Sequence, residues 1–171
     1  MTPQAKRAAS RRRAKTSGTE AADIAEITQA IYRYAWAIDS REFALLDSIF
    51  TPDATLHYNF FGLKPRSFAD TKPWLEASLR IHRVTQHNMT TPRVELSGDS
   101  AASTTYGVLV HAQEKLDGAM SVVTQHGVYV DAWLRTAAGW RSQSRRLDNL
   151  FIVGRFLGPN EVKAFARPLP Y

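Results

Sequence analysis

The sequence predicts an α+β fold, a cone-shaped α+β barrel in which a curved antiparallel sheet wraps around a pocket closed by N-terminal helices. Helical periodicity is confined to the first half of the chain, and four long β-rich segments follow it, at 85–97, 100–115, 119–136 and 140–153. Breaks of two to four residues separate these segments, which is typical of hairpins, so we expect antiparallel neighbours. Strands this long must twist and curve, and helices over the concave side then enclose a pocket.

Three helices and one short strand are expected before the sheet. Apolar side chains recur at three- and four-residue steps from Ile27 through Ile31 to Ile38, which predicts an amphipathic first helix. Ser40 is a suitable N-cap for a second helix. The expected elements, in order, are helices over 21–38 and 41–50, a strand over 54–60, and a third helix over 68–81.

Length and charge indicate one domain with two terminal extensions. The 171 residues are 44% apolar and carry a formal charge of +6. Residues 1–19 contain six basic and no acidic residues, so the remaining 16 basic and 16 acidic residues cancel. We therefore expect a disordered basic N-terminal arm (1–20), a domain (21–153) and a C-terminal tail (154–171) that packs on the domain or on a neighbouring subunit. Because the domain is neutral, a nucleic-acid partner is not expected.

Several chemistries are excluded by what the sequence lacks. It has no cysteine, which excludes disulfides, thiolate zinc sites and a cysteine nucleophile, and no apolar run long enough to cross a membrane. It also contains no phosphate-binding loop, dinucleotide fingerprint or helical pair of zinc-binding histidines. We expect a cytoplasmic protein without a cofactor or a metal.

Two residues far apart in the sequence could form an acid–base pair. His87 lies early in the first long β segment, on one strand face with Thr85 and Met89. Asp39 ends the apolar stripe of the first helix; it could hold a ring nitrogen of a histidine, or form a capping box with Glu42. His87 could equally be a structural histidine. Spacing alone does not show that the two residues meet.

Other polar residues could lie around the same pocket. Tyr34 is one helical turn before Asp39 and could donate to a developing oxyanion. The further candidates are His111 at a pocket rim, Tyr58 on the face of the short strand that carries Leu56, and His126 at the pocket mouth; His57 and His82 are expected at the surface.

Four short motifs resemble those of a known superfamily. They are IYRYA followed by ID (31–39), FTPDA (50–54), TQH (85–87) and GWR (139–141). In this order and spacing the chain resembles the nuclear-transport-factor-two-like superfamily, specifically its SnoaL-like branch, over about residues 23–150. Enzymes of this branch include scytalone dehydratase, bile acid dehydratase and hexachlorocyclohexane dehydrochlorinase.

The resemblance implies roles for individual residues. It implies that Asp39 pairs with His87 and that Tyr34 lies beside them as a hydrogen-bond donor. His111 and Tyr58 match a second histidine and a pocket tyrosine of scytalone dehydratase. Two polar pocket residues of that enzyme are replaced here, so the resemblance implies a more apolar pocket, lined by Met89, Leu109, Val128 and Val130.

Together, these features predict a cofactor-independent lyase (a dehydratase) or an isomerase that uses His/Asp general acid–base catalysis. Its substrate would be a hydrophobic, cyclic, oxygenated small molecule. The alternatives are a polyketide cyclase of the same fold and a non-catalytic binding or accessory subunit, which would lack a connected Asp–His pair. We also expect a homo-oligomer, a dimer or a trimer, with 154–171 contributing.

Overall fold

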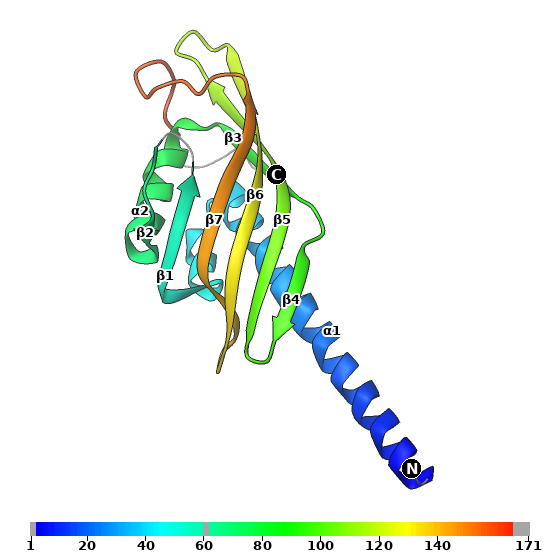
Figure 1. The fold of residues 1–171 in the computed structure, drawn as a ribbon. Helices are drawn as coiled ribbons and strands as arrows, with labels where there is room; N and C mark the ends of the chain where they lie inside the picture. The colour runs from blue at the N-terminus through cyan, green and yellow to red at the C-terminus, as the bar shows by residue number, and fades with distance from the viewer. Residues whose placement is uncertain (1–2, 60–61, 166–171) are drawn as a thin grey trace.

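A curved seven-stranded sheet and two α-helices form the molecule (Figure 1). The structure, a computed structural model, describes residues 3–59 and 62–165, with side chains from Thr19 onwards. The first two residues of the expected arm, Phe60 of the expected strand and residues 166–171 of the expected tail lie outside the described residues. The elements are α1 (Pro3–Ser40), η1 (Phe43–Ser48), β1 (Phe50–Asn59), β2 (Arg66–Ser67), α2 (Phe68–Ser78), η2 (Leu79–Ile81), β3 (Val84–Met89), β4 (Arg93–Ser97), β5 (Ser100–Glu114), β6 (Met120–Thr136) and β7 (Gly139–Val153).

The sheet has the order β2-β1-β7-β6-β5-β3, and β4 also pairs with β5. Its long strands are antiparallel hairpin neighbours as expected, while β1 runs parallel to β7. The sheet curves around α1 and α2 without closing on itself, which is the α+β cone that the sequence predicts (Figure 1). The three hairpin turns contain Gly98, Gly118 and Gly139, each with a positive φ.

Two expected elements and one expected cap differ from the structure. The expected second helix is only the six-residue 3-10 helix η1, because the strand β1 already starts at Phe50, which pairs with Ser142 of β7. Ser40 does not cap η1: it is the last residue of α1, and its hydroxyl donates to the Trp36 carbonyl. The segment 85–97 is divided into β3 and β4, and the division falls at Pro92, which has no N–H to donate.

The helix α1 begins at Pro3, well before the expected start at residue 21. Its N-terminal half extends away from the sheet, and its C-terminal half crosses the concave face (Figure 1). Residues from Ile27 to Ile38 supply the buried stripe of this half. Within the described part of the chain, no helix is both long and apolar enough to cross a membrane.

The C-terminal tail contacts the domain as far as it is described. Leu157 and Val162 are buried. The Gln113 side chain forms two hydrogen bonds with the Leu157 backbone, and the Phe165 N–H donates to the Arg80 carbonyl. These contacts hold Phe156 over one end of the concave face.

Candidate functional site

Asp39 and His87 form a doubly hydrogen-bonded pair. One carboxylate oxygen of Asp39 accepts the backbone N–H of His87 at 2.7 Å, and the other lies 2.7 Å from the His87 Nδ1. The His87 and Asp39 side chains are only 5% and 13% exposed. The carboxylate favours a proton on Nδ1, so Nε2 is the nitrogen with an available lone pair in the neutral ring. The structure thus brings together the two residues whose pairing the resemblance implies, and Asp39 does not form a capping box.

The backbone turn at Arg41, and the hydrogen bonds of its side chain, hold the end of α1 against β3, so that Asp39 lies beside His87. Arg41 has a φ of 65°, which turns the chain sharply at the end of α1. Its guanidinium donates to the Ile38 carbonyl, to the Thr85 hydroxyl at 2.7 Å and to the His82 carbonyl at 3.4 Å. One side chain therefore ties the end of α1 to β3 and to the segment after η2.

His87 lines a cavity of about 150 Å³ between the sheet and α2. A cavity of this size accommodates a single benzene-sized ring. Its apolar lining is Ile38, Trp74, Leu75, Leu79, Leu109, Leu147 and Phe156. Its polar lining is Tyr34, Tyr58, Ser78, His82, His87, His111, Gln125 and Tyr129. Such a mixture of apolar walls and a few polar groups is typical of a small-molecule site.

Two buried phenols lie on one side of His87. The Tyr34 and Tyr58 hydroxyls are 2.9 Å apart, and the Tyr34 ring centroid is 6.2 Å from that of His87. Burial raises the pKa of the Tyr34 phenol, and the positive charge of Arg145 opposes that effect. Burial also places the pKa of Tyr58 well above its usual range, so both hydroxyls stay protonated at neutral pH. One hydroxyl donates to the other, and the pair can donate one further hydrogen bond.

A buried ion pair, which the sequence analysis did not identify, supports the phenols. Arg145 and Asp131 are fully buried and face each other across β6 and β7, with Nε 2.6 Å from a carboxylate oxygen. The Arg145 guanidinium carbon lies 4.2 Å from the Tyr34 ring centroid. This cation is placed to stabilise negative charge that develops near Tyr34.

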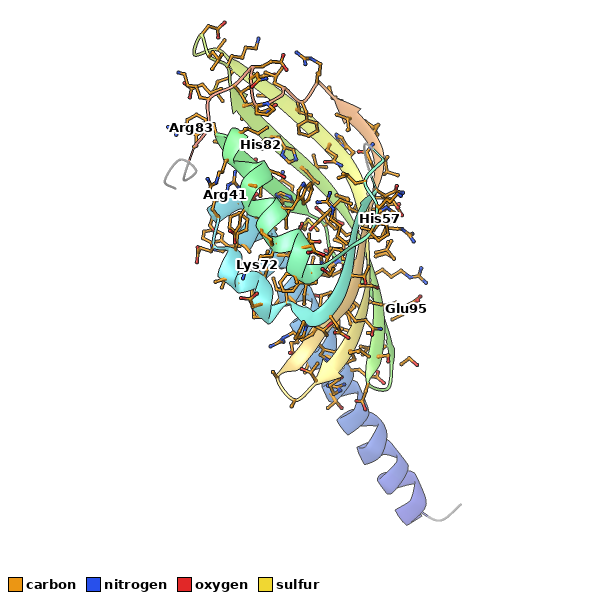
Figure 2. All side chains as sticks on the ribbon, turned by 90° about the vertical axis from the view of Figure 1, so that its left-hand side faces the viewer. Arg41, His57, Lys72, His82, Arg83 and Glu95 are labelled. Carbon is orange, nitrogen blue, oxygen red and sulfur yellow. The ribbon has the colours of Figure 1, made fainter. Side chains whose placement is uncertain are left out.

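Two further histidines lie on the other side of His87. His111 lines the cavity, as expected, but His82 is also there and only 8% exposed, so the expectation of a surface position for His82 is wrong. The rings of His82 and His111 are 5.1 Å apart, and both contact the Phe156 ring. Figure 2 shows His82 near Arg41, whereas His57 lies well apart and bonds the Leu63 carbonyl.

Both of these imidazoles are held neutral. Burial, and next to it the charge of Arg41, lowers the pKa of His82 to about 4, while the Ser78 carbonyl acts in the opposite direction. Burial, with His87, His82 and Arg41 as smaller contributors, places the pKa of His111 well below its usual range. At neutral pH each ring thus offers one N–H donor and one acceptor.

Four of the other predicted pocket residues are not in the cavity lining. Met89 packs against the two core clusters, and Val128, Val130 and His126 lie on the outer face of β6. The inward face of β6 is the opposite one, which carries Gln125 and Tyr129. Both faces of β6 carry apolar residues, so alternation did not distinguish them. His126 instead stacks on Phe151, with ring centroids 4.1 Å apart. Leu109 and Tyr58 do line the cavity.

Gln125 is a further polar residue that was not predicted. It is 2% exposed, lines the cavity, and pairs with Leu109, which pairs in turn with His87. Its amide nitrogen has no hydrogen-bond partner among the described residues. Nor does the described part of the chain bring together three His, Asp or Glu side chains in a manner suited to a metal ion.

Fold and site define a class of protein: an α+β cone with a small pocket and a histidine–carboxylate pair in its wall. The chain belongs to the SnoaL-like domain family, whose model matches residues 19–146. An uncharacterized protein of Mycobacterium tuberculosis is 33% identical over 131 residues, which are 75% of this chain and 86% of that protein.

Two solved structures illustrate the fold. A Kribbella flavida protein has a TM-score of 0.73 and 27% identity, over 78% of this chain and 95% of its own. A candidate scytalone dehydratase of Novosphingobium aromaticivorans has a TM-score of 0.69 and 17% identity, over 90% of this chain and 98% of its own.

Proposed function

We propose that the protein is a cofactor-independent dehydratase that removes water from a cyclic β-hydroxy ketone, with His87 as the general base. The observation that carries this proposal is the pair of hydrogen bonds that the Asp39 carboxylate accepts from His87, in the wall of a largely apolar cavity. A carboxylate on Nδ1 raises the basicity of Nε2 and stabilises the imidazolium that forms after proton transfer. Such general-base help contributes roughly 10²–10⁴-fold to a rate.

The reaction is a β-elimination. His87 Nε2 takes the proton from the carbon next to the carbonyl, and the C–H electron pair forms an enolate. As the enolate collapses, a C=C bond forms and the C–O bond to the β-hydroxyl breaks. The imidazolium returns its proton to the departing hydroxyl, which leaves as water, so no external acid is consumed. The Tyr34–Tyr58 pair donates one hydrogen bond to the carbonyl oxygen, where negative charge develops, because the other hydroxyl hydrogen lies in the bond between the two phenols.

The neutral state of His111 favours Tyr34 over His111 as the group that donates to the developing oxyanion. Tyr34 and His111 both line the cavity, and either could in principle protonate the leaving group or the oxyanion. Because His111 is held neutral by its surroundings, it carries no readily donated proton at neutral pH. Tyr34, with Arg145 behind its ring, is better suited to the oxyanion.

Cavity size and the comparisons support this choice. A cavity of about 150 Å³ favours a one-ring substrate. The candidate scytalone dehydratase that shares the fold bears the name of a dehydrating enzyme. A connected Asp39–His87 pair is the feature that a purely binding subunit would lack. A cyclase or an isomerase would start with the same proton abstraction.

The test uses 3-hydroxycyclohexanone, the simplest one-ring β-hydroxy ketone. We expect the wild-type protein to form cyclohexenone, detected by enone absorbance, and His87→Ala to lose this activity while it remains folded. The matched control is His126→Ala, which removes a histidine outside the cavity and leaves the rate unchanged. No enone above the buffer rate with wild-type protein would contradict the proposal.

A further inference from the structure

Three groups of polar side chains lie in a row along the cavity, and the proposed reaction uses two of them; Ser78, Gln125 and Tyr129 also line the cavity. The first is the Tyr34–Tyr58 phenol pair and the second is His87. The third is the His82–His111 pair. His87 contacts both of the others, since its ring centroid is 6.2 Å from that of Tyr34 and 6.1 Å from that of His111. Along β5, Thr105 pairs with the Tyr129 that Tyr34 contacts, Leu109 pairs with His87, and His111 follows two residues later, so His87 lies between the other two groups. A ligand that spans the row meets hydrogen-bonding groups at both ends.

The third group has unused hydrogen-bonding capacity. His82 and His111 are each 8% exposed, and their four ring nitrogens form no hydrogen bond of normal distance and angle with the described residues, although the Ser78 carbonyl is near enough to His82 to act on its pKa. The two rings are nevertheless in contact, with centroids 5.1 Å apart. Buried polar groups without partners destabilise a fold, so a pair of them lining a cavity indicates a ligand.

The chemistry of this pair selects the kind of ligand group. Two neutral imidazoles offer N–H donors and bare nitrogen acceptors, and no full charge. A hydroxyl group matches this, because it can accept from one ring and donate to the other. An ether or ketone oxygen accepts only. A carboxylate would lie against an unprotonated ring nitrogen, which repels it.

We propose that His82 and His111 form a hydroxyl-binding subsite, and that the protein selects one-ring ketones with a hydroxyl group across the ring from the carbonyl. This inference deepens the proposed function and rests on it only in placing the ketone carbonyl at Tyr34 and Tyr58. His82 and His111 are specificity-determining residues in this account, and neither takes part in proton transfer.

The experiment measures equilibrium binding by calorimetry with cyclohexanone, 4-methoxycyclohexanone and 4-hydroxycyclohexanone. The last carries its hydroxyl outside the β position and cannot undergo the elimination, so binding is read without turnover. We expect wild-type protein to prefer 4-hydroxycyclohexanone by about tenfold, the effect of a neutral hydrogen-bond pair. His82→Phe and His111→Phe should abolish the preference, so that the ratio of the affinities for 4-hydroxycyclohexanone and cyclohexanone falls to about one.

His82→Leu serves as a second variant where a phenyl ring does not fit, and His126→Phe is the matched control that keeps the preference. Because His82→Phe removes two unpartnered buried nitrogens, its melting temperature should not fall. The proposed subsite is wrong if wild-type protein does not bind 4-hydroxycyclohexanone at millimolar concentration, or binds it no more tightly than cyclohexanone. It is also wrong if the folded His82 and His111 variants keep the preference. Retained preference in wild-type protein without any turnover of 3-hydroxycyclohexanone would refute only the proposed dehydration.

Discussion

At the scale of single residues, His87 is fixed by two bonds to one carboxylate. Asp39 holds both the backbone N–H and the ring of His87, so it sets the rotamer and the tautomer together. Neither bond involves the nitrogen that would meet a substrate. Loss of the Asp39 charge is therefore expected to affect catalysis more than it affects the shape of the pocket.

The first prediction concerns this pair as a unit. With 3-hydroxycyclohexanone, His87→Ala should lower kcat by roughly 10²–10⁴-fold because the base is gone. Asp39→Asn should also lower kcat, since a neutral amide no longer stabilises the imidazolium. The double variant should be little slower than His87→Ala alone, because residues that act together are not additive. Steady-state kinetics on the four proteins checks this, and multiplicative losses would contradict it.

The second prediction concerns pH and stability. Because burial lowers the pKa of His82 to about 4, the unfolded chain binds more protons than the folded one between about pH 6.5 and pH 4. The free energy of unfolding should therefore be highest above pH 6.5 and should decrease as the pH is lowered. The protonation of His82 alone should decrease it by about 3 kcal/mol by pH 4. The lowered pKa of His111 adds to the same loss.

Urea unfolding at neutral pH and near pH 4 measures this loss. His82→Phe with His111→Phe should lose less stability across that window than the wild type does. Carboxylates titrate near the lower end in both proteins, so the comparison isolates the imidazoles. If the wild type and the double variant lose equal amounts of unfolding free energy, His82 and His111 are not held neutral by burial in the folded protein.

The sequence predicted the residues on strand β3 and helix α1 better than those on β6. Asp39, His87 and Tyr34 could be found because a polar residue beside an apolar stripe is conspicuous. On β6 the inward Gln125 and the outward Val128 gave no such contrast, and the wrong face was chosen. His82 was missed because nothing local shows that the end of a short helix is buried.

At the scale of elements, a buried ion pair between Asp131 and Arg145 links the neighbouring strands β6 and β7. The two opposite charges lie at directly paired positions and are completely buried, and the Arg145 guanidinium contacts the ring of Tyr34. Such a pair is retained at a desolvation cost, and removal of one partner leaves an isolated buried charge.

The third prediction follows from that pair. Asp131→Asn should reduce the free energy of unfolding by about 3–5 kcal/mol, because Arg145 is left without a counter-charge. The double variant Asp131→Leu, Arg145→Met should be more stable than Asp131→Asn. Denaturant unfolding of the three proteins is the measurement. A single variant as stable as the wild type would show that the guanidinium charge is compensated by other groups.

Element boundaries were predictable where turns carry a strong local signal. Gly98, Gly118 and Gly139 marked the hairpins, and the helix α2 with η2 covers the expected 68–81. The region between α1 and β1 was not predicted correctly, because pairing of Phe50 with β7 outweighs its helical periodicity. The parallel pairing itself depends on contacts distant in sequence.

At the scale of the whole molecule, the outer face of the sheet carries exposed apolar side chains. Val122 on β6 and Phe151 and Val153 on β7 are all more than half exposed. Contiguous apolar surface of this kind is commonly covered by a partner. We propose that this face forms the interface of a homo-oligomer.

The fourth prediction tests that assembly. Light scattering at micromolar concentration should give the mass of a dimer or a trimer, and Phe151→Glu should shift it toward the monomer because a charge would be buried. Deletion of residues 1–18 should leave the number of subunits in the oligomer unchanged, although it removes six positive charges and makes the net charge zero. A monomeric wild-type protein would contradict the proposed interface.

If His87 removes a proton from the carbon beside a carbonyl, exchange of that proton with solvent measures the step directly. In deuterated water, NMR follows the incorporation of deuterium at the α-carbon of 4-hydroxycyclohexanone, which cannot proceed to elimination. We expect wild-type protein to accelerate this exchange and folded His87→Ala protein not to do so. Exchange by His87→Ala at the wild-type rate would contradict this expectation.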